Sequence, residues 1–301
     1  MRVEPLAPQP LGSLLVELAE GLERAGIALA PDEARDIVAA VLDVPRYWPT
    51  THRDALLDPS AISEARNAAA TRARGAPFAY AVGRAAFRYL TLAVDERVLI
   101  PRQETEVLVD LVLKAEGGGR GTIVDVGTGS GAIALALATE GTFDAIVATD
   151  VSLDALAVAE QNAAFHRDDL RAPIEFVHGS LLAPVSDRCV RAIVSNPPYV
   201  AFSELEELPA SVRDWEPPLA LLSGDGGMAA TRAIVREAAR VLEPGGLLAF
   251  EVDTRRASLV AEAVATHGEY REVAVHLDLT GRERFVLARR REGNQATGNS
   301  G

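Results

Sequence analysis

The chain is poor in the residues that build covalent or metal-held scaffolds. Its 301 residues include one cysteine, Cys189, so no internal disulfide can form, and we expect a reducing compartment, the cytoplasm. The five histidines are scattered, so we expect no metal site. No apolar run reaches the roughly 18 residues of a membrane helix, and the first residues do not resemble a signal peptide.

Positive charge is also scarce. Lysine and arginine total 30 against 43 aspartates and glutamates, which gives a net charge of −13. Surfaces that neutralise many phosphates carry a basic field, so this charge argues against nucleic acid as a partner, although a local basic patch could still exist. Basic proteins are more natural partners. Hydrophobic residues make up 48% of the chain, enough for a real core in one large or two ordinary domains.

The first part of the chain has the apolar spacing of helices. Three prolines within residues 1–10 predict a disordered lead-in. Apolar residues at helical spacing then predict a small helical domain over residues 1–75. Its predicted helices cover 11–25, a stretch beginning after Pro31, and shorter pieces around 51–57 and 60–73. A β-hairpin or linker follows over residues 76–99.

From Gly121 onward, predicted strands and helices alternate. The predicted strands are 122–126, 145–150, 174–178, 190–195 and 247–252, with helices at about 131–139, 152–166 and 228–242. Such alternation predicts a parallel sheet covered on both faces. The last two strands, 270–276 and 283–288, predict an antiparallel hairpin. We therefore predict a Rossmann-like α/β domain over 100–290, with a mostly parallel seven-stranded sheet, and a disordered tail over 291–301.

A glycine-rich turn joins the first of these strands to its helix. Gly127, Thr128, Gly129, Ser130 and Gly131 form this turn, whose glycines let a ligand approach the backbone at a helix N-terminus. Two ligands fit. The spacing is compatible with a dinucleotide fingerprint, and it is equally compatible with S-adenosylmethionine.

Two aspartates accompany the turn. Asp150 ends the next strand, where it could accept hydrogen bonds from ribose hydroxyls of either ligand. Asp125 lies just before the turn, and it could cap the loop or contact the ligand's amino group. Neither residue decides between the two ligands.

The stretch Asn196-Pro197-Pro198-Tyr199 follows a buried strand and favours one of the ligands. The prolines cannot donate hydrogen bonds, so the strand must end there with carbonyls free to accept. Asn196 adds a side-chain amide and Tyr199 a flat apolar face, which together suit a planar –NH2 group. At the carboxyl edge of a parallel sheet this stretch lies beside the cofactor crevice. A dehydrogenase has no obvious use for it, so the combination predicts a methyltransferase that uses S-adenosylmethionine.

Three stretches resemble those of the protein-(glutamine-N5) methyltransferases that act on peptide-chain release factors. They are Ile100-Pro-Arg-Gln-Glu-Thr-Glu106, Asp125-Val-Gly-Thr-Gly-Ser-Gly-Ala132 and Ser195-Asn-Pro-Pro-Tyr199. The resemblance covers roughly residues 10–290. Asn-Pro-Pro-Tyr is shared with DNA adenine and RNA guanine methyltransferases. The first stretch, which starts a helix and could close a polar pocket, is more specific, because the sister family that modifies a ribosomal protein usually has Pro-Arg-Ser-Pro there.

The resemblance implies an enzyme whose N-terminal helical domain docks a release factor. Apart from the resemblance, we expect a monomer. The resemblance also implies a cofactor pocket and a bound Gly-Gly-Gln loop, with Asn196, Pro197 and Tyr199 as catalytic residues. The implied cofactor-binding residues are Gly127, Thr128, Gly129, Ser130, Gly131, Asp150, Leu181 and Asn196, and the implied glutamine-binding residues are Asn196, Pro197, Pro198 and Tyr199. The chain departs from the family at Gln103, Ser180 and Leu181, and after the fifth strand at Glu251-Val-Asp-Thr-Arg.

Other functions remain open at this point. The same site could methylate a DNA or RNA base, or a glutamine of a ribosomal protein. A non-catalytic module could also retain the fold and grip a partner with its helical domain. The intact glycine turn and the intact Asn196–Tyr199 stretch argue against that module.

Overall fold

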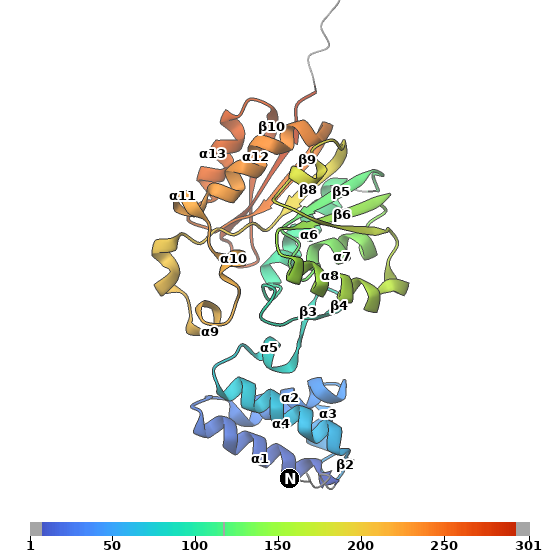
Figure 1. Ribbon diagram of the computed structural model, residues 1–301, viewed down its shortest axis with the longest axis vertical. Helices are drawn as coiled ribbons and strands as arrows, with labels where there is room; N and C mark the ends of the chain where they lie inside the picture. Colours follow the sequence, from blue (N-terminus) through green and yellow to red (C-terminus); the bar gives the residue numbers. More distant parts are fainter. Residues whose placement is uncertain (1–7, 117, 293–301) are drawn as a thin grey trace, which may run out of the picture. The chain divides into compact units, whose positions relative to one another are not determined.

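The computed structural model describes residues 8–116 and 118–292 and contains two compact units (Figure 1). Among the described residues, the N-terminal unit consists of 8–84 and Pro209–Trp215, and the sheet unit consists of 85–116, 118–208 and 216–292. The dividing point at Arg84 falls inside the segment 76–99. Most of the predicted tail and the first seven residues of the predicted lead-in lie outside the described residues.

The N-terminal unit is a helical bundle. Leucines on one face of its first helix, such as Leu14 and Leu18, are buried together with Ile37 and Ile62 of two further helices. Prolines in the first turns of two helices fix backbone angles that suit helix initiation. The helices are α1 (Leu11–Arg24), α2 (Ala30–Leu42), α3 (Trp48–Thr51), α4 (Pro59–Ala73), α5 (Phe78–Val82) and α9 (Ala210–Arg213).

Two predictions for this unit are wrong. Instead of a helix around 51–57, the chain forms strand β2 (Leu56–Leu57), which pairs antiparallel with β1 (Gln9–Pro10). Gln9–Pro10 is therefore a strand and not part of a disordered lead-in. The reason is tertiary, because the backbone N–H groups at the start of α1 bond to carbonyls of 53–55, at 2.9 Å and 2.7 Å.

The sheet unit contains a seven-stranded sheet in the order β10-β11-β9-β8-β5-β6-β7. The strands β9, β8, β5, β6 and β7 are parallel, and β11 runs antiparallel to both β9 and β10. This confirms the predicted fold class. The strands are β5 (Thr122–Val126), β6 (Ala145–Asp150), β7 (Ile174–His178), β8 (Val190–Ser195), β9 (Leu242–Glu251), β10 (Tyr270–Leu277) and β11 (Glu283–Arg290).

Helices cover both faces of this sheet (Figure 1). Alternate residues of each strand enter two separate cores, so that Ile123 packs with α6 and α7 while Val124 packs with α12 and α13. Helix α13 was not predicted, although Ala257, Val260 and Val264 carry a helical apolar spacing. The longer helices are α6 (Gln103–Glu116), α7 (Ala132–Glu140), α8 (Leu153–Phe165), α12 (Ala229–Val241) and α13 (Ala257–Thr266). The short helical segments are α10 (Pro218–Leu221), α11 (Gly224–Gly227) and the 3-10 turns Arg167–Asp169, Ala183–Val185 and Phe202–Glu207.

A two-stranded hairpin, β3 (Arg84–Phe87) and β4 (Leu90–Ala93), is fixed to α8 by buried polar side chains. Asn162 accepts from the Ala93 N–H at 2.7 Å and donates to the Ala93 carbonyl at 3.1 Å. The same amide donates to the Ser130 carbonyl at 2.9 Å, and His166 Nε2 donates to the Thr91 carbonyl at 2.9 Å. Asn162 thus ties the predicted hairpin to the glycine-rich turn.

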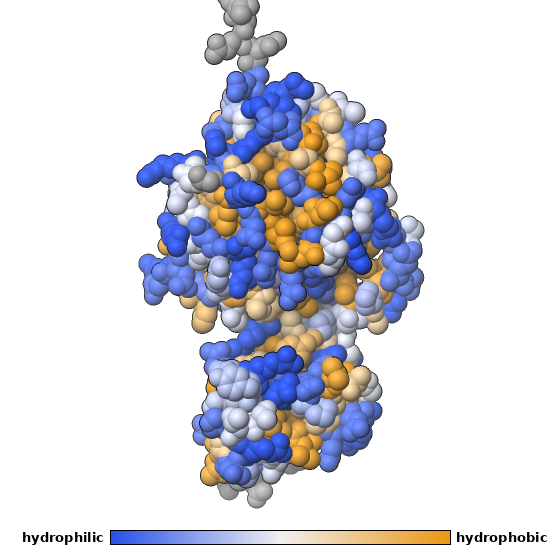
Figure 2. Space-filling view, turned by 180° about the vertical axis from the view of Figure 1, so that it is seen from behind, coloured by the Kyte–Doolittle hydropathy of each residue, from blue (hydrophilic) through white to orange (hydrophobic). Residues whose placement is uncertain are grey.

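The surface of the sheet unit carries an area rich in hydrophobic residues (Figure 2). On the face packed by α6, the β9–β11–β10 edge leaves a depression of about 340 Å³, lined in part by Leu111, Leu247 and Leu287. None of the described helices is long and apolar enough to cross a membrane. Within residues 8–116 and 118–292, no group of three or more His, Cys, Asp or Glu side chains could hold a metal ion.

Candidate active site

The predicted site residues follow three neighbouring parallel strands. Val126 at the end of β5 is paired with Thr149 of β6 on one side and with Ser195 of β8 on the other. The segments that follow these strands therefore leave the sheet at one edge, where ligands of open α/β sheets bind. This register brings the glycine-rich turn, Asp150 and Asn196 together.

The glycine-rich turn has the backbone conformation that its glycines permit. Gly127 and Gly129 have φ values of 75° and 56°, in the left-handed region that side chains rarely adopt. A Cβ atom built on either would meet nothing within 4 Å, so the backbone faces open space. At Gly131 a Cβ would lie 3.2 Å from that of Ala159, so this glycine allows the turn to pack on α8. The open side is a place where a ligand can approach the backbone closely.

Asp125, near the end of β5, caps the glycine-rich turn with its side chain. Its Oδ2 accepts from the Thr128 hydroxyl at 2.6 Å and from the Ala134 N–H in the first turn of α7 at 3.2 Å. The side chain is fully buried, and its Oδ1 has no hydrogen-bond partner among the described residues. This burial raises the pKa of Asp125 to about 7. Asp125 thus caps the loop, which is one of the two roles that the sequence suggested for it. Its Oδ1 remains available for a further hydrogen bond.

Asp150 supports the same turn from β6. Its Oδ2 accepts from the Gly129 N–H and its Oδ1 from the Ser152 N–H, both at 2.9 Å. Because each carboxylate oxygen can accept more than one hydrogen bond, the group retains capacity for ligand hydroxyls. Sequence reasoning missed Thr149, whose hydroxyl donates to the Leu181 carbonyl at 3.1 Å. Leu181, half-buried with φ of 49°, is thereby fixed beside the end of β6.

Asn196 stands at the end of β8, and its surroundings come from distant parts of the chain. The preceding residue, Ser195, donates from its buried hydroxyl to the Val126 carbonyl at 2.7 Å, which joins the ends of β8 and β5. Asn196 Nδ2 donates to Thr105 Oγ1 at 3.3 Å. Thr105 lies in the first turn of α6, so the segment 100–106 both starts a helix and contributes a buried hydroxyl to the site.

The backbone of Tyr199 is fixed by a glycine that sequence reasoning missed. A Cβ at Gly227 would lie 2.2 Å from the Tyr199 carbonyl oxygen, so no other residue fits there without a backbone shift. Beyond it, the Val200 N–H donates to the Leu221 carbonyl and its own carbonyl accepts from Ser223, both at 2.9 Å. Burial raises the pKa of the Tyr199 phenol to about 12, so it stays protonated near neutral pH.

Two buried glutamates also reach this edge and were not predicted. Glu216 accepts from Arg102 Nη2 at 2.5 Å and from the Ile100 N–H at 3.2 Å, which holds the segment leading into α6. Glu251, at the end of β9, is 1% exposed, and an interaction with the Thr105 side chain opposes the rise that burial causes in its pKa. Only the departure of the motif after β9 could have drawn attention to Glu251.

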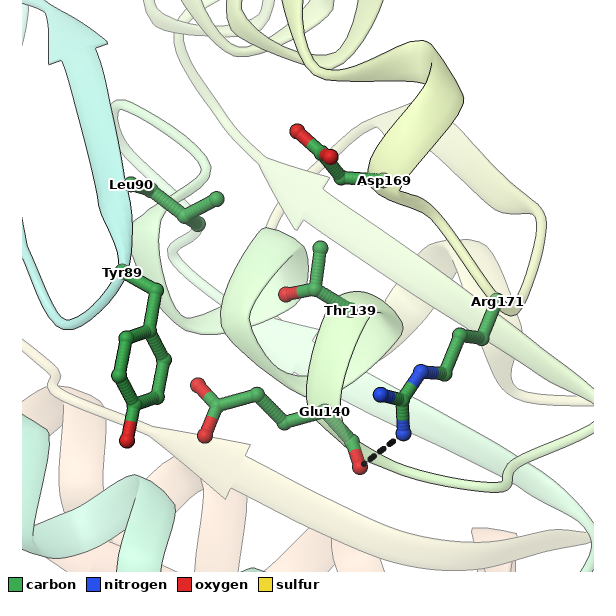
Figure 3. A pocket seen from close by; sticks show the side chains of 6 residues that line it. All are labelled: Tyr89, Leu90, Thr139, Glu140, Asp169 and Arg171. Carbon is green, nitrogen blue, oxygen red and sulfur yellow. Dashed lines mark hydrogen bonds between the residues drawn. The ribbon is translucent and has the colours of Figure 1, made fainter.

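A separate depression of about 480 Å³ lies elsewhere on the sheet unit (Figure 3). It is lined by Tyr89, Leu90, Thr139, Glu140, Asp169 and Arg171. Thr139 and Glu140 end α7 and Arg171 precedes β7, so the depression belongs to the amino end of the parallel strands. In Figure 3 Arg171 reaches the Glu140 carbonyl, at 3.3 Å. The depression holds none of the predicted site residues and is not the candidate site.

Comparison with protein families divides the chain in the same order. Residues 13–83 match the model of the PrmC N-terminal domain, and residues 103–209 match that of the Methyltransferase small domain. A protein of Moorella thermoacetica is 39% identical over 285 residues, covering 94% of this chain and 98% of its own. A protein of Deinococcus radiodurans is 38% identical over 284 residues, covering 94% and 99%. Both relatives are named release factor glutamine methyltransferase.

Solved structures share the fold at lower identity. The hMettl16 catalytic domain, in complex with MAT2A 3'UTR hairpin 1, has a TM-score of 0.57 at 19% identity, covering 76% of this chain and 82% of that one. A methyltransferase from Pyrococcus furiosus has a TM-score of 0.50 at 19% identity, covering 67% and 88%. At such identities the likeness concerns the fold alone.

Burial of Asp125 makes a pH-dependent prediction. Its folded-state pKa of about 7 lies above the ordinary value of 3.8, so the unfolded chain loses this proton first. The contribution of protonated Asp125 to the free energy of unfolding is fully present below about pH 4 and is lost as the pH rises to about 7. Asp125→Asn keeps an acceptor for Thr128 and Ala134 but cannot ionise. The variant's free energy of unfolding, relative to wild type, should therefore rise by up to a few kcal/mol over this range and then level off.

Unfolding of the two proteins, followed by circular dichroism at several pH values, measures this difference. Asp154→Asn, an exposed acid in the first turn of α8, is the matched control and should show no such trend. A difference for Asp125→Asn that stays constant with pH would show that burial does not perturb the carboxyl.

Proposed function

The chain belongs to the release factor glutamine methyltransferases, and we propose that it transfers a methyl group from S-adenosylmethionine to the side-chain amide nitrogen of a release-factor glutamine. The glutamine is that of a Gly-Gly-Gln loop. The observation that carries the proposal is the register of β5, β6 and β8, which puts an open glycine turn and the Asn196–Tyr199 stretch at one edge of the sheet.

The residues at this edge fit S-adenosylmethionine. The open backbone at Gly127 and Gly129 allows close approach, and Thr128, Ser130 and Gly131 complete the turn. The carboxylate of Asp150 can accept from ribose hydroxyls while it holds the turn. Leu181 would line the adenine side, and Asn196 would border the reactive end. When bound, the cofactor supplies an electrophilic methyl carbon on a sulfonium.

The Asn196–Tyr199 stretch would orient the substrate amide. An amide nitrogen is a poor nucleophile because its lone pair is delocalised into the carbonyl. Asn196 Oδ1 and the Pro197 carbonyl can accept its two N–H bonds, which fixes the nitrogen and favours pyramidalisation toward the methyl group. The Pro198 and Tyr199 surfaces would support the side chain. Alignment of this kind can lower a barrier by several kcal/mol, and the excess proton can leave to water.

The helical N-terminal unit would select the protein substrate. It matches the PrmC N-terminal domain and, in the range that the structure describes, holds none of the proposed catalytic residues. A release factor acts at the ribosome, so the enzyme would work in the cytoplasm. It would act as a monomer.

If the N-terminal unit sets partner choice, kcat/KM for an intact release factor should far exceed that for a short Gly-Gly-Gln peptide. Equal values would refute this role.

A nucleic-acid base is the second candidate substrate, since an exocyclic amine could also lie on Asn196–Tyr199. The net charge of −13 argues against it. Incubation with labelled cofactor and either a release factor or DNA and RNA separates the two. Label on the Gly-Gly-Gln glutamine supports the proposal, and label on nucleic acid alone overturns it.

Asn196 should govern the chemical step more than cofactor binding. Its acceptor contact strengthens as the amide nitrogen gains positive charge in the transition state. We expect Asn196→Ala to lower the single-turnover rate of release-factor methylation by about 10²-fold or more, with a much smaller loss of cofactor affinity. Tyr199→Phe, which keeps the ring, should be mild. A near wild-type rate for Asn196→Ala would contradict the assigned role.

Asp150 should govern cofactor affinity. Asp150→Ala removes charge-assisted hydrogen bonds to the ribose, each of about 1.5–3 kcal/mol, and also the bonds that hold Gly129 and Ser152. The affinity for S-adenosylhomocysteine, measured by calorimetry, should fall by at least about tenfold. Asp154→Ala is the control. Tight binding of NAD to the wild-type protein, with none of S-adenosylhomocysteine, would overturn the cofactor assignment.

A further inference from the structure

We propose that Glu251 and Thr105 are positioning residues whose hydrogen-bond chain sets the orientation of the Asn196 amide, and hence which of its atoms meets the substrate. The proposal rests on the function proposed above. It concerns three side chains that reach one place from β9, α6 and the end of β8. None of the sequence motifs indicated that they are connected.

The β8–β9 register, which pairs Ser195 with Phe250, brings Asn196 and Glu251 to neighbouring strand ends. Asn196 Nδ2 lies 3.3 Å from Thr105 Oγ1, and hydrogen bonding by Thr105 favours the ionised form of the Glu251 carboxyl, against the effect of burial on its pKa. Thr105 is 5% exposed and Glu251 1% exposed, so water does not replace these bonds readily. Asn196 itself is only partly buried and borders the open edge. The hydrogen-bond chain therefore runs from buried Glu251 to Asn196 at the side where the substrate would bind.

The numbers of donors and acceptors determine which group donates at each link of the hydrogen-bond chain. An ionised carboxylate only accepts, and a threonine hydroxyl has a single proton to donate. When Thr105 donates that proton to Glu251, its oxygen can only accept, and it accepts from Asn196 Nδ2. The amide is then held with Oδ1 free for the substrate N–H. The ionised form of Glu251 thus selects the amide orientation that the proposed reaction needs.

Protonation of Glu251 would remove this selection. A protonated Glu251 can donate to Thr105, and Thr105 can then donate to Asn196 Oδ1, which turns the amide nitrogen toward the substrate. The substrate –NH2 would then face a donor instead of an acceptor. The rate of methyl transfer should accordingly depend on the protonation state of Glu251.

The surroundings of Glu251 make this titration accessible. Burial raises the pKa of Glu251 to about 7, and its Oε2 has no hydrogen-bond partner in the described parts of the chain. The neighbouring charges oppose one another. Arg284 of β11 and Arg102 before α6 favour the ionised form, whereas Glu104 of α6 disfavours it. The phenol of Tyr199 also faces the group and stays protonated.

The test is the pH profile of single-turnover methylation of a release factor at saturating cofactor. For the wild-type enzyme we expect the rate to rise through about pH 7 to a plateau. Glu251→Gln keeps the size of the side chain but can donate to Thr105 at any pH. It should lower the plateau rate by at least about tenfold, as for one lost hydrogen bond, and abolish the rise. Its affinity for S-adenosylhomocysteine and its thermal unfolding should remain close to wild type.

Companion variants keep the test decisive if Glu251→Gln folds poorly. Thr105→Val removes the hydroxyl at nearly constant volume and should reproduce the slow, pH-independent rate, while Thr105→Ser should restore both rate and profile. Glu104→Gln removes the charge that opposes ionisation, so it should shift the rise to lower pH without lowering the plateau. Glu160→Gln, an exposed position on α8, is the inert control.

The outcomes separate this inference from the proposed function. If wild-type enzyme does not methylate the release factor, the proposed function fails. If it does, and either Thr105→Val or a folded Glu251→Gln retains the wild-type rate and pH profile, only the hydrogen-bond chain is refuted. Loss of rate in Thr105→Ser equal to that in Thr105→Val would also refute it, because packing and not the hydroxyl would then matter.

Discussion

The end of β5 is the point on which the site depends. Val126 pairs with Thr149 of β6 and Ser195 of β8, and the Ser195 hydroxyl donates to the Val126 carbonyl at 2.7 Å. Two prolines then stop β8 one residue later. The ends of β5 and β8 are therefore held together at the sheet edge, with the glycine-rich turn following β5 and Asn196 following β8. A one-residue shift of β8 in this pairing would turn Ser195 to the opposite face of the sheet.

Burial of charge is concentrated at this edge. Asp125 and Glu251 each keep one oxygen without a hydrogen-bond partner among the described residues, and burial raises both pKa values to about 7. A fold optimised only for stability would not retain such groups, because an unpartnered buried polar atom is costly. Perturbed carboxyls cluster at functional sites for this reason. Their occurrence beside both the turn and Asn196 supports one continuous site.

Supporting contacts come from elements that carry no proposed chemistry. Asn162 on α8 joins the β3–β4 hairpin to the carbonyl of Ser130. Glu216 holds Arg102 at the entry to α6, which places Thr105 against Asn196. Gly227 leaves room for the carbonyl of Tyr199. Residues of this kind position the site without touching a ligand, and their substitution would disturb it indirectly.

The sequence by itself determined the order and type of the main elements, and four strand predictions, such as 122–126, match the structure residue for residue. It also indicated the glycine turn, Asp150 and Asn196–Tyr199, because turns and strand ends are local features marked by glycine and proline. The strand at Gln9–Pro10 and the contacts of Thr105, Glu251 and Gly227 were decided by the tertiary structure alone. Thr105 and Asn196 are 91 residues apart, and no local pattern records which distant side chain packing brings to a given atom.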